Sequence, residues 1–314
     1  MTPRAASVLL STALLALSVP AAHAAAPGSV TLRYAMKPGA GYDQAASMAL
    51  EMAVDPTGLP PAMSGLLQSM VGDMKQEINL KGRIDVGQKA GDGSLPIQYK
   101  VIEARAVLNH AGQIKEMPGV SSAASQPPTA GQISADGRQV TMESPAGSGQ
   151  MPRALHDQIT QALPTLPAGA LSPGKAFDVI VPMTLFGGLS KGLEKANARW
   201  TYTLRSLAQD EALFDVQESL PENASMTMSS GQVIHLSGGG KGAATFNLKE
   251  GIFTSMKLDT SIQMTVVMSI PAGLAGGGTA GAGAAGDPGA PSSIEIKSSI
   301  QGPITMTLAP SAGR

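Results

Sequence analysis

The sequence predicts a mainly β protein: a large, curved antiparallel sheet, or half-barrel, that is internally duplicated and carries a few short helices on its concave face. Three observations predict this fold: long stretches in which apolar and polar residues alternate, turn signals between those stretches, and an order of elements that occurs twice. Successive side chains of a β-strand point to opposite faces of a sheet, so a period of two indicates a half-buried strand.

The clearest alternation covers residues 252–270. Every even position there is apolar except Thr254 and Thr260, and every odd position is polar except Phe253 and Val267. At about 3.3 Å per residue, a strand of this length spans about 60 Å, several times the length of an ordinary strand. A strand that long has to bend, which favours a large curved sheet.

The same alternation predicts further strands. Residues 74–86 and 293–308 form two more long amphipathic strands, and residues 42–54 are interpreted as another, although their alanine content also suits a helix. Asp136-Gly137 and Glu250-Gly251 are typical of tight hairpin turns. Shorter strands are predicted at 30–34, 95–108, 177–183, 200–207 and 213–216.

Helical spacing of apolar residues occurs in three places, at 61–71, 152–163 and 185–196. Helices of about a dozen residues are about 18 Å long, much shorter than the predicted strands. Residues 271–291 are rich in glycine and alanine and are predicted to form a flexible loop.

The N-terminus predicts export. Arg4 precedes an apolar stretch at 8–19, and Ala22-His23-Ala24 is a small-x-small cleavage motif. Residues 1–24 are therefore expected to be a signal peptide, and the mature protein to be periplasmic or secreted. The apolar stretch is shorter than the ~20 residues that a membrane-spanning helix needs. The absence of cysteine excludes a lipid-anchored form.

A short motif occurs twice. Pro38-Gly39 is followed after two residues by Tyr42-Asp43, and Pro173-Gly174 is followed after two residues by Phe177-Asp178. A strand, a helix, a second strand and a hairpin turn are predicted after each copy, which indicates an internal duplication. We predict an N-terminal β half at 25–150 and a C-terminal β half at 151–314, with a connecting helix at 151–163.

These motifs carry a family resemblance. Residues 32–39 read Leu-Arg-Tyr-Ala-Met-Lys-Pro-Gly, and Gly240-Lys241-Gly242 precedes the last hairpin turn. The chain resembles a bacterial secreted family of unknown function with a duplicated curved sheet, and its layout is similar to periplasmic lipoprotein- and lipid-carrier half-barrels of the LolA and LppX type. The resemblance implies a long-stranded sheet wrapped around helices or a hydrophobic ligand, and it supplies no catalytic residue. The chain departs from it in having no lipidation cysteine and few aromatic residues.

Composition argues against several classes of partner. A net charge of −1 gives no reason to expect nucleic acid or an anionic membrane surface. Aromatic residues make up 3% of the chain, too few for the interfacial girdles of an outer-membrane barrel, so we expect the protein not to span a membrane.

No catalytic or metal-binding pattern emerges. Zero cysteines exclude thiolate chemistry, and His110, His156 and His235 fall in different predicted elements, which favours neither a catalytic triad nor a metal site. Residues 238–242 read Gly-Gly-Gly-Lys-Gly, but a phosphate-binding loop needs Ser or Thr after the lysine, so we interpret this run as a turn. We therefore expect no enzyme activity, no catalytic residues and no cofactor.

The alternate apolar positions of the long predicted strands are rich in methionine, which has a flexible and polarizable side chain. Two interpretations are open: these residues fill a core beneath the helices, or they line a groove for a lipid, an acyl chain or another apolar partner. Because the strands are much longer than the helices, we favour the groove, with a structural or assembly protein of the cell envelope as the alternative. The oligomeric state stays open. The predicted lining residues are Met48, Met52, Met74, Ile78, Leu80, Met256, Leu258, Ile262, Met264, Met268, Ile304 and Met306.

Overall fold

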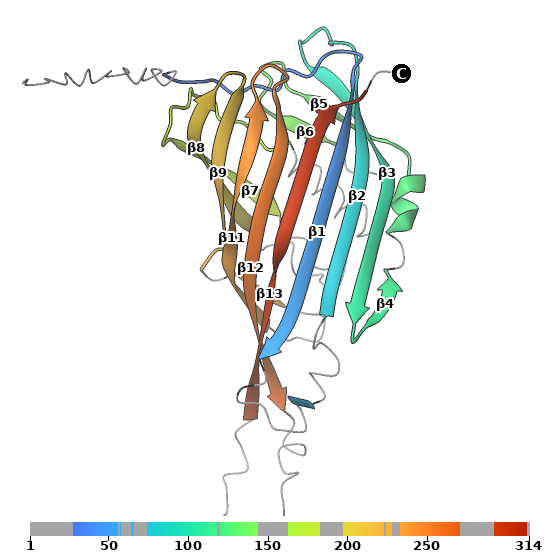
Figure 1. Cartoon of the computed structure of the whole chain (residues 1–314), viewed down its shortest axis with the longest axis vertical. Coiled ribbons are helices and arrows are strands. Elements are labelled where there is room, and N and C mark those ends of the chain that lie inside the picture. The colour runs from blue at the N-terminus through green and yellow to red at the C-terminus, as the bar shows by residue number, and fades with distance from the viewer. Residues whose placement is uncertain are drawn as a thin grey trace, which may run out of the picture.

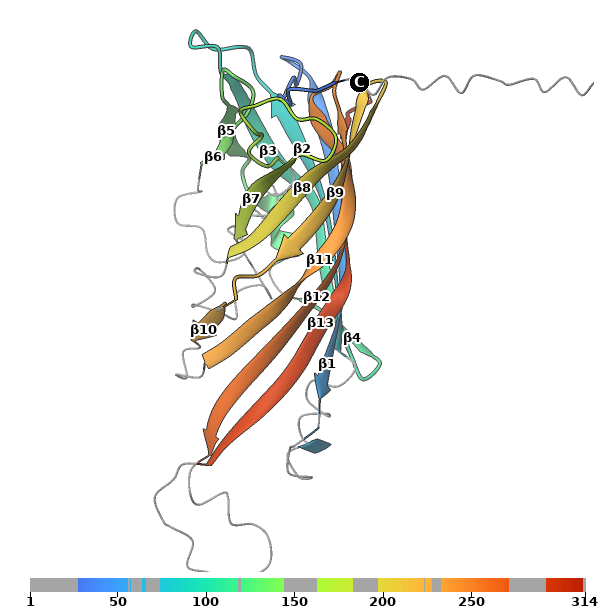
Figure 2. The same cartoon turned by 90° about the vertical axis from the view of Figure 1, so that its left-hand side faces the viewer.

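The described part of the chain forms one large antiparallel sheet of thirteen strands, which confirms the predicted fold class (Figure 1). The computed structural model describes residues 28–55, 57, 64–65, 74–117, 120–143, 163–182, 197–222, 224–227, 233–270 and 292–312. The sheet is open, because β6 and β7 form its two edges. Figure 2 shows from the side that the sheet is strongly curved.

The described residues of the first half of the chain form six strands and one short 3-10 helix: β1 (Gly41–Asp55), β2 (Met74–Val86), β3 (Leu95–His110), β4 (Gln113–Glu116), η1 (Ser121–Ser125), β5 (Thr129–Ile133) and β6 (Val140–Met142). The second half forms β7 (Ala176–Pro182), β8 (Asn197–Ala208), β9 (Glu211–Ser219), β10 (Ser225–Thr227), β11 (Val233–Asn247), β12 (Ile252–Ile270) and β13 (Ser292–Pro310).

The order across the sheet is β6-β5-β3-β2-β1-β13-β12-β11-β9-β8-β7, with β4 beside β3 and β10 beside β11. Two successive meanders are thus joined through β1 and β13, the first and last strands, which lie side by side in Figure 1. The two edge strands β6 and β7 follow each other in the sequence but do not pair with each other.

The alternation of side chains is confirmed in the long strands. Strands β2 and β12 have the predicted bounds, and the ambiguous residues 42–54 belong to strand β1. Ile133 of β5, Val181 of β7 and Leu258 of β12 belong to one core cluster, so the sheet curves around its buried face. We call this concave side, toward which the even-numbered residues of β1, β2, β12 and β13 point, the inner face.

The N-terminal segment, residues 30–37, corrects one prediction. A strand was predicted at 30–34, but only Val30 makes an isolated bridge, to Leu171. Leu32 and Tyr34 are buried in the core, and the Tyr34 hydroxyl donates a 2.7 Å hydrogen bond to the Pro164 carbonyl. The side chains of this segment therefore alternate between buried and exposed, although its backbone does not pair as a strand.

Two matching turns enclose the N-terminal segment. Gly137 (φ 67°), between β5 and β6, accepts a 2.6 Å hydrogen bond from the Tyr34 amide, and Gly251 (φ 61°), between β11 and β12, lies against Arg33 and Ala35. A left-handed conformation at these positions favours glycine. The two hairpin turns predicted from Asp136-Gly137 and Glu250-Gly251 are therefore confirmed.

The scarce aromatic residues gather in one part of the core. Phe177 stacks on Tyr202 with ring centroids 5.1 Å apart, and Phe246 and Phe253 meet edge to face at 5.0 Å. Phe253 is an odd residue in β12, yet it is buried, because a register shift between Thr245 and Phe246 in β11 changes the pairing there. The shift explains this exception to the alternation.

The interpretation of residues 238–242 as a turn is wrong, because they lie inside strand β11. A side chain at Gly242 would collide with the Lys257 carbonyl of β12, which pairs with this part of β11. These glycines thus permit a close approach of neighbouring backbones within a bent sheet.

Several predicted segments lie outside the described residues: the signal peptide at 1–24, the loop at 271–291, the helix at 185–196, the helix at 152–163 except Leu163, and most of the helix at 61–71. The short 3-10 helix η1 was not predicted from the sequence. Its Ala123 packs with Leu80 of β2 and Ala104 of β3, so it covers a small part of the inner face.

The β5–β6 turn predicts a pH dependence of stability. Hydrogen bonds from Ser134 Oγ (2.6 Å) and Arg138 Nε (2.8 Å) lower the pKa of Asp136 from 3.8 to about 2. Because the folded-state pKa is lowered, this carboxylate stabilises the fold above pH ~4, and the contribution is lost as the pH falls from about 4 to about 2.

We therefore expect Asp136→Asn to be less stable than the wild type near pH ~6 and to lose less of its stability on acidification to pH ~2. Urea unfolding at the two pH values measures both effects. Ser134→Ala, which removes the first of the hydrogen bonds, should shift the profile in the same direction. An unchanged acid profile in both variants would contradict this role of the turn.

Candidate ligand-binding face

The inner face brings the predicted lining residues together in rows that cross the sheet. Met48 of β1 lies between Ile78 of β2 and Ile304 of β13, and Ile304 pairs with Leu258 of β12. Paired residues of neighbouring strands have Cβ atoms about 4.5–5.5 Å apart, so these four side chains form a continuous apolar row.

Two further rows follow the same pattern. On one side of the first row, toward the β11–β12 turn, Leu80, Ala46, Met306 and Met256 are consecutive partners. On the other side, one row further on, Met74, Met52, Ile300 and Ile262 are consecutive partners. Met264 lies two residues beyond Ile262 on β12, where it pairs with Ser298 of β13. The pairing of Met268 with Ile294 continues the series, but the Met268 side chain lies outside the described part of the structure.

Burial divides the predicted residues into two groups. Those nearest the core are buried: Leu80, Met256, Leu258, Ile262 and Met306. The others retain partial exposure: Met48, Met52, Met74, Ile78, Met264 and Ile304. The partly exposed side chains are apolar surface that a hydrophobic partner can still bury.

A polar row, which the sequence did not reveal, crosses the same face. It contains three buried polar residues, Gln76, Thr260 and Glu218. Across the sheet, the residues of the row follow one another in the order Gln76, Leu50, Gly302, Thr260, Gly240, Glu218 and Trp200. This row lies between the Met48 row and the Met52 row. Thr260 and Gln76 interrupt the apolar parity of their strands, and this signal could have identified the row.

Glu218 is the ionisable member of the polar row, and it is 8% exposed. Its Oε1 atom accepts a 3.3 Å hydrogen bond from Trp200 Nε1, and its Oε2 atom accepts a short hydrogen bond from the Thr260 hydroxyl. An added side chain at Gly240 would approach Glu218 Oε2 to 2.9 Å, so the missing side chain leaves room for the carboxylate to reach β12.

On the opposite side of the sheet, which we call the outer face, the charged side chains are arranged differently. Lys75 and Glu51 pair at 2.6 Å, and Lys81 and Glu103 pair at 2.7 Å, with all four side chains more than half exposed. Such exposed pairs contribute little to stability, about 0–1 kcal/mol. They give the outer face balanced charge, whereas the Glu218 carboxylate receives hydrogen bonds from neutral donors.

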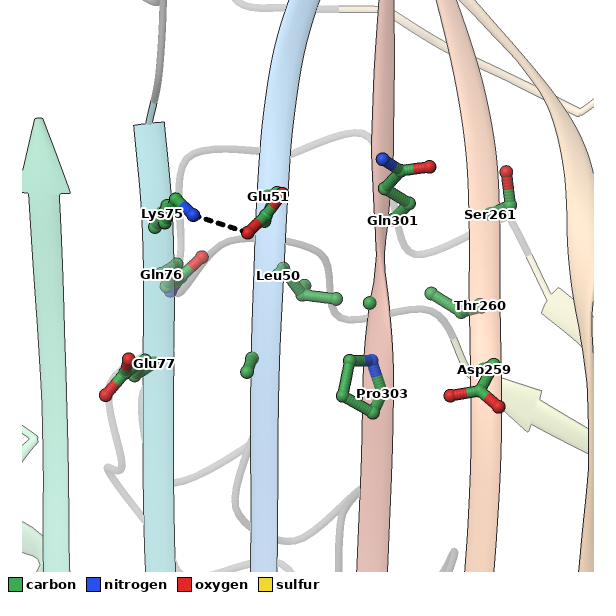
Figure 3. A pocket seen from close by; sticks show the side chains of 12 residues that line it. Leu50, Glu51, Lys75, Gln76, Glu77, Asp259, Thr260, Ser261, Gln301 and Pro303 are labelled. Carbon is green, nitrogen blue, oxygen red and sulfur yellow. Dashed lines mark hydrogen bonds and ion pairs between the residues drawn. The ribbon is translucent and has the colours of Figure 1, made fainter.

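An open depression of about 570 Å³ surrounds Gly302 of β13. Figure 3 shows the side chains that line it, which come from β1, β2, β12 and β13. Its rim is polar and includes Glu77 and Asp259 on either side. Within the described part of the chain, no three His, Cys, Asp or Glu side chains converge as metal ligands. The depression lies at the polar row: Leu50, Gln76 and Thr260 of that row contribute to its lining, and its charged residues Glu51, Lys75, Glu77 and Asp259 come from the face opposite to the methionines.

Two further polar side chains point inward from β1 and β3. Gln44 and Tyr99 are both 2% exposed, and in the described structure neither the Gln44 amide nor the Tyr99 hydroxyl has a hydrogen-bond partner. The Tyr99 hydroxyl lies over Gly82, which pairs with Gln44. Burial raises the pKa of Tyr99, so the phenol stays neutral and can both donate and accept hydrogen bonds.

The histidines do not form a site in the described residues. His110 ends β3, whereas His235 lies in β11, several strands away in the sheet. His156 is outside the described part of the chain.

Comparison with known proteins finds no matching family model and no similar curated protein sequence. The resemblance to lipid-carrier half-barrels therefore stays a prediction. Among the described residues, no helix has both the length and the hydropathy needed to cross a membrane.

Proposed function

We propose that this protein is a non-enzymatic, exported β protein that binds a hydrophobic ligand, a lipid or an acyl chain, on its Met-rich inner face. One observation carries the proposal: six apolar residues that the alternation selects lie on this face and are only half buried, and among them Met48 pairs with Ile78 and Ile304, and Met52 pairs with Met74. Export is supported by the predicted signal peptide at 1–24.

The chemistry of the face suits such a ligand. Burial of each CH₂ group of an acyl chain contributes about 0.8 kcal/mol, and flexible methionine side chains can adapt to a chain of variable shape. Leu258 and Ile262, which are buried beside the half-exposed methionines, provide a rigid floor.

A substitution on this face tests the proposal. We expect Met48→Asp to weaken binding of a fluorescent fatty acid by the mature protein at least about tenfold, because a carboxylate would replace apolar surface in the centre of the first row. Fluorescence titration measures the affinity. The matched control is Ala45→Asp, an exposed position on the outer side of the same strand, which should bind like the wild type.

Native mass spectrometry of the purified protein should also show a co-purifying amphiphile. A clean apo spectrum, together with no uptake of the fluorescent fatty acid, would exclude ligand binding and favour the alternative role, a structural or assembly protein of the cell envelope. That role predicts a protein partner in pull-down experiments instead of a lipid.

A further inference from the structure

We propose that the ligand of the inner face is an amphiphile with a protonated amine, and that Glu218 binds this amine. The inference rests on the proposed function and adds the chemical class of the ligand. It starts from the position of a carboxylate, 8% exposed, in a row between two apolar rows of the same face.

The first argument is charge. A buried carboxylate is costly unless a cation or several hydrogen bonds compensate it. The hydrogen bonds that Glu218 accepts come from the Trp200 indole and the Thr260 hydroxyl, both neutral donors. In the described ion pairs, every basic side chain is at least 34% exposed, the value for Arg83 and Arg138. A ligand ammonium would supply the missing positive charge.

The second argument is capacity. An ionised carboxylate has about four lone-pair sites, and the two hydrogen bonds from Trp200 and Thr260 use only part of them. Those two donors also fix the carboxylate in one orientation across Gly240, between β9 and β12. A positioned acceptor of this kind binds an ammonium with little further loss of side-chain freedom.

The third argument is the surroundings. Leu258 lies one row from the polar row on β12, and Ile262 lies one row away on the other side. Both residues are buried, but Leu258 pairs with the half-exposed Ile304 of β13, which pairs with the half-exposed Met48 of β1. An aliphatic tail of an amine bound at Glu218 could therefore cover apolar surface toward β13 and β1. The pattern of one acidic group in an apolar face fits a single positive headgroup joined to a hydrocarbon chain.

The test compares ligands that share a tail and differ in the headgroup. Isothermal titration of the mature protein with dodecylamine, dodecanol and dodecanoate should give the tightest binding for the amine, at least about tenfold tighter than for the alcohol, and the weakest for the carboxylate. Spermidine, a polyamine without a tail, should bind at least about tenfold more weakly than dodecylamine. This arm separates an amine-bearing lipid from a free polyamine.

A variant then assigns the effect to one side chain. Glu218→Gln keeps the size of the side chain and removes its charge, and it should weaken dodecylamine binding at least about tenfold while dodecanol binding changes less than about twofold. The matched control is Glu211→Gln, an exposed position at the start of the same strand, which should leave both affinities unchanged.

The outcomes are distinct. If dodecylamine binds no better than dodecanol, or if Glu218→Gln binds it like the wild type, the inference is overturned, and Glu218 serves only to join β8, β9 and β12. If none of the three tailed ligands binds, the proposed function itself fails. The ligand series on the wild-type protein decides the matter even if the Glu218 variant does not fold.

Discussion

Replacing Phe214 by alanine is expected to lower the free energy of unfolding by about 3–5 kcal/mol. Phe214 is fully buried in β9, and its ring centroid lies 6.0 Å from that of Phe177, 6.3 Å from Tyr202 and 6.1 Å from Phe253. The substitution would leave a cavity within the aromatic cluster, where the surrounding rings cannot collapse without leaving their contacts with one another, such as the stacking of Phe177 on Tyr202. Urea unfolding followed by circular dichroism measures the change.

Ile180→Ala provides the control for this loss. Ile180 lies on the edge strand β7, close to the same cluster in sequence, but its side chain is 56% exposed. We expect it to change the unfolding free energy by no more than about 0.5 kcal/mol. Equal losses in the two variants would show that the aromatic cluster is not the main source of stability at this end of the sheet.

Gly251→Ala is the second substitution with a large expected effect. Gly251 has a φ of 61°, and an added Cβ would lie 2.5 Å from the Arg33 carbonyl oxygen and closer still to the Ala35 amide. Alanine would thus carry a backbone strain of about 1–2 kcal/mol and would also displace the N-terminal segment from the core. We expect a total loss of at least about 3 kcal/mol in urea unfolding.

Gly174→Ala separates these two causes. Gly174 has a φ of 84°, similar to that of Gly251, but an added Cβ there would meet nothing within 4 Å. Its variant should lose only the backbone strain, about 1–2 kcal/mol. If the two alanine variants are equally stable, the contact between Gly251 and the N-terminal segment contributes nothing measurable.

Much of the fold could be predicted from alternation, because each long strand has one buried and one exposed face. The alternation of apolar and polar residues predicted the bounds of β2 and β12, and it favoured a strand over a helix for residues 42–54. It also selected the inward residues correctly, since Leu80, Leu258 and Met306 are buried whereas Lys257 and Asp259 are exposed.

Other features depend on contacts that a local pattern does not contain. Residues 30–34 alternate like a strand, but Leu32 and Tyr34 are buried by turns that come much later in the chain. The run at 238–242 has the composition of a turn, yet its glycines serve the close approach of β11 to β12. A short window of sequence cannot distinguish these cases.

The candidate site was predicted only in part. The apolar residues of the inner face follow from parity, but Glu218 lies beyond the segment predicted as a strand at 213–216, and its partners Trp200 and Thr260 come from separate strands. Their alignment in one row depends on the register of β8, β9, β11 and β12. Register over several strands is a property of the whole sheet.

The pairing of β1 with β13 has a consequence for how the protein folds. This seam joins residues from opposite ends of the chain, from Tyr42 with Pro310 to Asp55 with Lys297. Closing so long a loop is entropically costly, and β1 has no partner on this side until residues 292–310 have been synthesised. The first meander would therefore wait with the unpaired edge of β1, and an unpaired strand edge with an apolar face is the kind of surface that aggregates. Pairing of β1 with β13 would therefore be a late and slow step in the assembly of this sheet.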